Sequence, residues 1–69
     1  MRTFQLHGHK IEVVPTMQAL GDQPFRVRVY TLDESAFQGF MIEAGAPVNA
    51  ALAAYDKCLE MYGEKWNAR

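Results

Sequence analysis

The chain has 69 residues, of which 49% are hydrophobic and 22% are charged, with a formal net charge of -1 at pH 7 and a single cysteine. A chain of this length buries only roughly 60% of the surface that its unfolded form exposes, which excludes a second core and predicts one domain over residues 1–69. The ordinary composition excludes a disordered protein, and the slightly negative charge argues against a strong basic field for nucleic acid over the whole domain.

The first predicted element is a β-hairpin within "FQLHGHKIEV", residues 4–13, where apolar and polar residues alternate on both sides of a glycine. A two-residue loop at Gly8 and His9 would place every apolar residue opposite another. The pairs would then be His7 with Lys10, Leu6 with Ile11, Gln5 with Glu12, and Phe4 with Val13. Glycine in the first central position is what a type II′ turn requires, because φ is positive there. This turn places His9 at an exposed tip.

A loop and the clearest strand of the chain follow. Residues 15–24, "PTMQALGDQP", begin and end with proline, which predicts a loop with one turn of helix over residues 17–20. Residues 25–32, "FRVRVYTL", alternate between apolar and polar side chains and predict a strand. Its two faces would carry Phe25, Val27 and Val29 on one side, and Arg26, Arg28 and Tyr30 on the other.

A fourth strand and a helix complete the predicted fold. The strand is "FQGFMIE", residues 37–43, in which Gly39 indicates a bulge or a close approach of another backbone. Pro47 marks the start of the helix, because proline at the first helical position sacrifices no hydrogen bond. The apolar stripe of the helix would comprise Val48, Ala51, Leu52, Tyr55, Cys58, Leu59, Tyr62 and Trp66. The sequence therefore predicts an α+β domain, an antiparallel four-stranded meander (ββββα) with one C-terminal amphipathic helix packed on one sheet face and capped by Gly63.

Few residues indicate chemistry. His7 and His9 would share a face on a strand and could bind a metal there, but a turn at the glycine between them separates the two rings, and no further cluster completes a ligand set. Ser35 lacks the strand-to-helix elbow that exposes a catalytic serine. Cys58 falls on the apolar stripe, where a free cysteine is most often a small core residue. We therefore expect no enzyme activity, no metal, no cofactor and no small-molecule substrate.

The sequence also bears on location. It has no basic start followed by an apolar core and a small-residue cleavage site, and no apolar run approaches the ~20 residues of a membrane span. One unpaired cysteine is typical of a reducing compartment. We expect a soluble cytoplasmic protein that does not bind a membrane.

One helix can bury only one face of the predicted sheet, so the other face is the candidate binding surface. The predicted contact residues are Arg26, Arg28, Tyr30 and Phe40, with His7 and Lys10 at the periphery. Aromatic residues and arginine are favoured in protein interfaces, which suggests a protein partner or self-association. Single-stranded nucleic acid is the alternative, since bases stack on sheet aromatics while arginines neutralise phosphates. A third interpretation is that residues 15–24 fold over the apolar end of the sheet and the arginines are merely solvated.

The run from "FRVRVY" to "AALAAYDKCLEMYG" is similar in layout to HicB-type antitoxin domains, in which a strand pair precedes an alanine-rich amphipathic helix that starts with proline or threonine. The resemblance covers about half of the chain and concerns architecture. It implies a small bacterial module of the ββα type. The "DGGY" and "PGC" signatures of that family are absent, so the resemblance does not extend to toxin binding.

Overall fold

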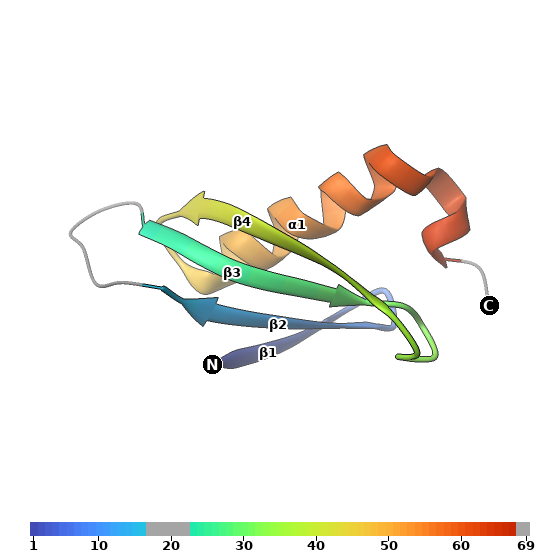
Figure 1. The fold of residues 1–69 in the computed structure, drawn as a ribbon, viewed down its shortest axis with the longest axis horizontal. Helices are drawn as coiled ribbons and strands as arrows, with labels where there is room; N and C mark the ends of the chain where they lie inside the picture. Colours follow the sequence, from blue (N-terminus) through green and yellow to red (C-terminus); the bar gives the residue numbers. More distant parts are fainter. Residues whose placement is uncertain (17–22, 68–69) are drawn as a thin grey trace.

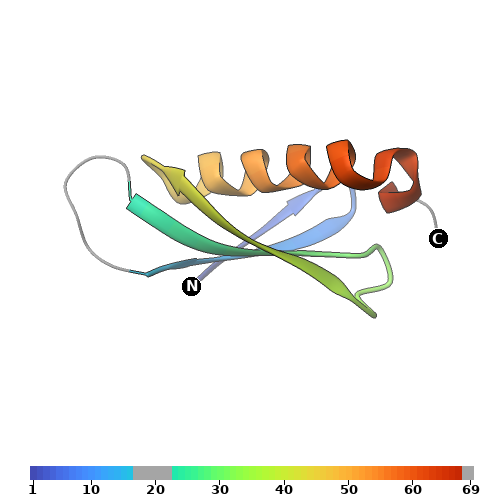
Figure 2. The same cartoon turned by 45° about the horizontal axis from the view of Figure 1, so that its top comes forward.

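In the computed structural model, which describes residues 1–16 and 23–67, four strands precede one long helix. The elements are β1 (Arg2–Leu6), β2 (His9–Pro15), β3 (Gln23–Tyr30), β4 (Phe37–Ala44), α1 (Pro47–Tyr62) and a short 3-10 helix, η1 (Gly63–Asn67). The strands pair antiparallel in chain order, and α1 crosses one face of the sheet (Figures 1 and 2). The predicted ββββα meander is confirmed. The helical turn predicted over residues 17–20 lies outside the described residues.

The first hairpin turns one residue earlier than the sequence predicts. Its central residues are His7 and Gly8, whose φ angles are 51° and 85°, and Leu6 pairs with His9. Two positive φ angles define a type I′ turn, whose twist matches that of the paired strands. The predicted type II′ turn and its strand pairs are therefore wrong. The faces are unchanged, because the register moves by two positions along β2, so that Leu6 still lies on the same face as Ile11.

The core lies between the sheet and α1. The strands contribute Ile11, Val13, Phe25, Val27, Val29, Ile42 and Ala44, and the helix contributes Ala50, Ala51, Ala54, Tyr55 and Cys58. The three helix alanines have small side chains, so α1 can approach the branched side chains of the sheet closely. The predicted common face of Phe25, Val27 and Val29 is confirmed, and it is the face that α1 covers.

The buried face of α1 is rotated away from part of the predicted stripe. Ala50 and Ala54 are fully buried, whereas Leu52 is 45% exposed and Val48 is also exposed. Residues four positions apart share one line down a helix, and Leu52 is two residues, or about 200°, from that line. The prediction that Leu52 and Val48 belong to the buried stripe is therefore wrong. The core positions of Ala51, Tyr55, Cys58 and Trp66 are confirmed.

The two ends of α1 follow the predicted signals. Pro47 lies in the first turn, and Gly63 ends the helix with a φ of 59° while its N–H donates to the Leu59 carbonyl. A residue with positive φ at this place stops an α-helix, which is why glycine is favoured there. The chain continues into η1, where Trp66 is buried. None of the helices in residues 1–16 and 23–67 is long and apolar enough to cross a lipid bilayer.

A buried histidine joins three segments that are far apart in the sequence. His9 is fully buried, with Nδ1 2.7 Å from the carbonyl oxygen of Tyr30 and Nε2 2.8 Å from Oδ1 of Asn67. A carbonyl oxygen only accepts hydrogen bonds, so Nδ1 donates to Tyr30. The Tyr55 hydroxyl donates to the same Asn67 oxygen at 3.1 Å, and the Trp66 ring stacks on His9 with 6.1 Å between centroids. The predicted exposed position of His9 is therefore wrong.

The orientation of α1 can be tested with two truncations. Ile11→Ala should lower the free energy of unfolding by about 2–5 kcal/mol, because it removes a fully buried side chain and leaves a cavity. Leu52→Ala, the matched control on the exposed side of α1, should change it by no more than about 0.5 kcal/mol. Urea denaturation followed by circular dichroism measures both. Equal losses would contradict the observed helix face.

The hydrogen bond between His9 and Asn67 of η1 leads to a second prediction. Asn67→Ala should cost about 1–3 kcal/mol, because it leaves the buried Nε2 of His9 without a partner. In a domain of this size each kcal/mol lowers the melting temperature by about 4–8 °C. Asn49→Ala, at an exposed position of α1, is the control. A melting temperature for Asn67→Ala equal to that of the control would show that this bond does not hold η1.

Candidate functional site

The sheet face opposite α1 is covered by no other element among residues 1–16 and 23–67 (Figure 2). This surface is termed the open face. Its central residues are Lys10, Glu12, Val14, Arg26, Arg28, Tyr30, Phe37, Gly39 and Met41. The register aligns Glu12, Arg28 and Gly39 in one row across the sheet, and Val14, Arg26 and Met41 in the next. The two arginines therefore lie at the centre of the open face.

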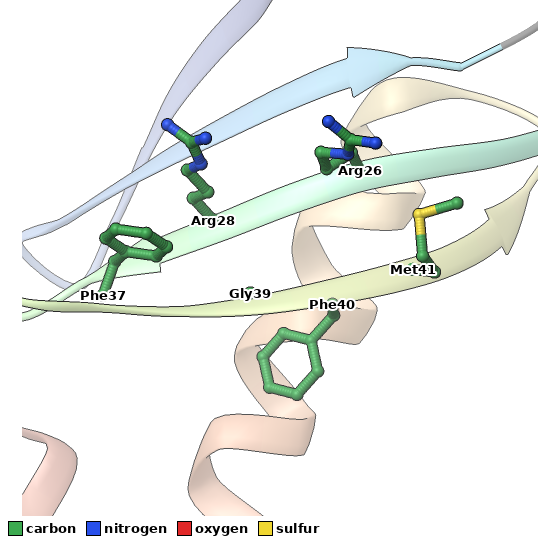
Figure 3. A pocket seen from close by; sticks show the side chains of 6 residues that line it. All are labelled: Arg26, Arg28, Phe37, Gly39, Phe40 and Met41. Carbon is green, nitrogen blue, oxygen red and sulfur yellow. The ribbon is translucent and has the colours of Figure 1, made fainter.

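Four of the predicted contact residues lie together on the open face, and two do not. Those on it are Arg26, Arg28, Tyr30 and Lys10. Phe40 is opposite Val27 and packs against the core, and Figure 3 shows its ring turned away from the arginines. His7 lies in the hairpin turn and stacks on Tyr55 of α1, with 5.4 Å between ring centroids. Placing Phe40 and His7 on the open face is therefore wrong.

Phe37 and Met41 are the most exposed apolar residues of the open face, and sequence reasoning did not assign them to the site. They are 49% and 60% exposed, on the same face as the arginines. The alternation in β4 contains apolar side chains on both sides, so it does not choose the face by itself. The ladder continues without interruption through Gly39, which pairs with Arg28, so the predicted bulge is wrong.

Tyr30 is held by its neighbours. Its hydroxyl donates to Oε1 of Glu12 at 2.8 Å, and its ring lies 5.4 Å from that of Phe37. Lys10 Nζ lies 5.1 Å from the centroid of the Tyr30 ring and 3.7 Å from carboxylate oxygens of both Glu12 and Glu34. These contacts engage the hydroxyl of Tyr30, one face of its ring and the Glu12 carboxylate. The Tyr30 side chain is therefore fixed by its neighbours and supports the open face.

Arg26 and Arg28 differ from Lys10 in their electrostatic pairing. In the part of the chain that the structure describes, neither guanidinium has a carboxylate oxygen within 4.0 Å. Arg28 is directly opposite Glu12 in the register, but its guanidinium lies over the Phe37 ring, 5.0 Å from the centroid. Because the Glu12 carboxylate is already engaged, two cationic groups remain on the open face without an anion.

A hollow of about 440 Å³ opens on this face beside the arginines (Figure 3). Its lining residues are Arg26, Arg28, Phe37, Gly39, Phe40 and Met41. A smaller hollow of about 130 Å³ is lined by Met1, Glu12, Val14 and the same two arginines. Gly39 contributes only backbone to the larger hollow. The site combines two guanidiniums with exposed apolar carbon, and it is open to solvent rather than enclosed as small-molecule sites are.

The other titratable groups have structural explanations. The pKa of Asp33 is lowered to about 2 because its carboxylate accepts hydrogen bonds from the hydroxyl and the N–H of Ser35 and from the hydroxyl of Thr31. Burial raises the pKa of the Cys58 thiol to about 11. Within the described ranges, no three His, Cys, Asp or Glu side chains come together as a metal site. None of these groups lines the hollows.

Comparison of the chain with protein-family models, with curated proteins and with solved structures finds no match. The similarity in layout to HicB-type antitoxin domains therefore stays a prediction.

The state of the Cys58 thiol gives a third prediction. At pH 8 a disulfide reagent such as dithionitrobenzoate should modify the folded protein slowly, because the thiol is buried and protonated. The same protein in urea is the control and should react as an ordinary thiol. Because the folded pKa lies above the ordinary 9.0, the thiol's contribution to stability is present below pH 9 and is lost as the pH rises toward 11. Equally fast reaction in both states would contradict its burial.

Proposed function

We propose that this protein is a small, non-catalytic, cytoplasmic protein-interaction module whose open face binds an extended segment of a partner protein. The segment would carry a carboxylate beside an apolar side chain. The main support is the state of Arg26 and Arg28, two exposed guanidiniums that share a hollow with exposed apolar carbon. Among the described residues, no carboxylate neutralises either of them.

The chemistry of the hollow fits such a segment. A guanidinium presents a planar fork of N–H donors that matches a carboxylate with two parallel hydrogen bonds. The Phe37 ring under Arg28 holds that fork in one plane, so less side-chain entropy is lost on binding. Met41 is flexible and polarizable, and it can adapt to an apolar side chain. Arginine, phenylalanine and methionine are also enriched in protein interfaces.

Single-stranded nucleic acid is the second candidate, because the Arg28 and Phe37 pair offers a cation next to an aromatic ring. The other contacts on the open face favour it less. The ring face that Phe37 would offer to a base is occupied by Arg28, and Lys10 lies over the ring of Tyr30. Glu12 lies in the same row as Arg28, so a phosphate backbone along that row would meet a carboxylate.

Peptide selection tests the proposed function. A random peptide library displayed on phage should be selected on the immobilised protein. We expect enriched peptides to carry Asp or Glu next to an aliphatic or aromatic residue. Binding should fall at least about tenfold in the double variant Arg26→Gln/Arg28→Gln, because it removes both charged anchors. The control Arg2→Gln/Lys57→Gln removes the same charge from exposed positions outside the open face, and its binding should be unchanged.

Two results would contradict this function. One is an equal loss of binding in the control variant, and the other is selection without a preference for acidic residues. A mixed-sequence single-stranded DNA oligonucleotide is the parallel probe. Amide shifts on the open face that disappear as salt is added would establish nucleic acid as the ligand instead, since counterion release makes such binding steeply salt-dependent.

A further inference from the structure

β4 is an edge strand whose outer side is unpaired. In the described ranges it pairs with β3 alone, and no side chain hydrogen-bonds to its backbone. It is eight residues long and contains neither proline nor lysine, which proteins commonly use to protect an edge, and its one charged residue is Glu43. The outer side of β4 therefore presents free N–H and C=O groups to a further strand.

The opposite edge of the sheet is less suited to pairing. β1 has five residues and carries Arg2. Pairing of β1 with β4 between copies would be head-to-tail, and such a contact can continue without closing. Pairing of β4 with β4 is two-fold symmetric and antiparallel, so it closes after two copies.

We propose that two copies of this chain associate through their β4 strands and join their sheets into one continuous sheet. The inference deepens the proposed function and rests on it in one respect. The proposed function assigns Arg28 to a carboxylate of a partner protein. The present inference identifies that carboxylate as Glu43 of the second copy.

The alternation of side chains restricts how the two strands can align. Odd-numbered residues of β4 lie on the open face and even-numbered residues lie on the helix face. Directly opposite residues in a sheet share a face, so in a symmetric antiparallel pair the two residue numbers add up to an even number. The longest overlaps are then centred on Phe40, with residues 37–43 paired, or on Met41, with residues 38–44 paired.

Charge selects the register centred on Met41. In that register Glu43 of the second copy lies opposite Gly39, whose neighbour on β3 is Arg28. Gly39 has no side chain, so the guanidinium can reach across β4 toward Glu43. The Cα atoms of Arg28 and of Glu43 in the second copy would be two strand spacings apart, roughly 10 Å. An arginine and a glutamate side chain together can span this distance. Symmetry repeats this contact, which gives two ion pairs for each dimer.

The apolar side chains agree with the same register. Met41, which is 60% exposed, would meet Met41 of the second copy on the open face. Phe40 would meet Ile42 of the second copy on the helix face. In the register centred on Phe40, Phe40 would meet Phe40 of the second copy, but Glu43 would lie opposite Phe37, Ile42 opposite Gln38 and Met41 opposite Gly39. That register would therefore lose the charge contact and the pairing of Met41. Charge pairs of this kind fix the register of an interface as well as contributing to its affinity.

A charge swap between two variants tests the pairing. Arg28→Glu and Glu43→Arg change exposed positions, so each variant should keep the circular dichroism spectrum of the wild type. In a dimer of either variant alone, both contacts join like charges. In an equimolar mixture, the mixed dimer has opposite charges at both contacts.

We expect the wild type to approach twice the monomer mass with rising concentration in sedimentation experiments. Each variant alone should associate roughly tenfold more weakly, because attraction becomes repulsion at two contacts. The mixture should recover the association of the wild type. Lys57→Glu and Glu60→Lys, which reverse exposed charges on α1, are the matched control pair and should each associate as the wild type does.

A wild type that stays monomeric, or a mixture no heavier than its components, would overturn the inference. The outcome is distinguishable from failure of the proposed function, because peptide selection through Arg26 and Arg28 does not require self-association. A monomer that still selects acidic peptides would keep the open-face function and remove the β4 pairing. Recovery in the mixture without peptide selection would support the β4 pairing and limit the interaction to a second copy.

Discussion

The hydrogen bonds of the buried His9 ring hold together the parts of this fold that are farthest apart in the sequence. The ring joins the start of β2 to the end of β3 and to η1, the last described element. A buried polar group without partners costs about 1–3 kcal/mol, so the burial of His9 depends on Asn67 staying in place. The same contact brings Trp66 over the end of a core in which α1 supplies mostly alanines. A polar contact thus lies beside Trp66 at one end of the apolar core.

Tyr30 connects this buried centre to the open face. Its carbonyl accepts from His9 on the inner side, while its side chain lies on the outer side and donates to Glu12. The Glu12 carboxylate also attracts Lys10, and it is therefore not paired with Arg28, its neighbour across the strands. The unpaired state of Arg28 follows from this arrangement of its neighbours. The contacts among Tyr30, Glu12 and Lys10 thus leave the Arg28 guanidinium available for the proposed interaction.

Local patterns predicted the elements well and the special positions poorly. β3 alternates strictly, so its two faces were predictable, although the strand spans Gln23–Tyr30 and not the predicted residues 25–32. Pro47 and Gly63 signalled the two ends of α1. The type of the hairpin turn was not predictable, because one glycine fits either the first central position of a type II′ turn or the second central position of a type I′ turn. The burial of His9 depends on Asn67, which is 58 residues away, and no local pattern contains that partner. The helical periodicity of α1 also did not show that its alanines, and not Leu52, face the sheet.

The ambiguity of β4 has a physical meaning. A strand with apolar side chains on both faces can bury only one of them under a single helix, so Phe37 and Met41 stay exposed whenever Phe40 and Ile42 are covered. The same strand is at the edge of the sheet and lacks the lysine or proline that would discourage pairing. Surplus apolar surface and free backbone groups thus coincide along β4, next to the unpaired arginines of β3. The proposed pairing of β4 with a second copy would use all three.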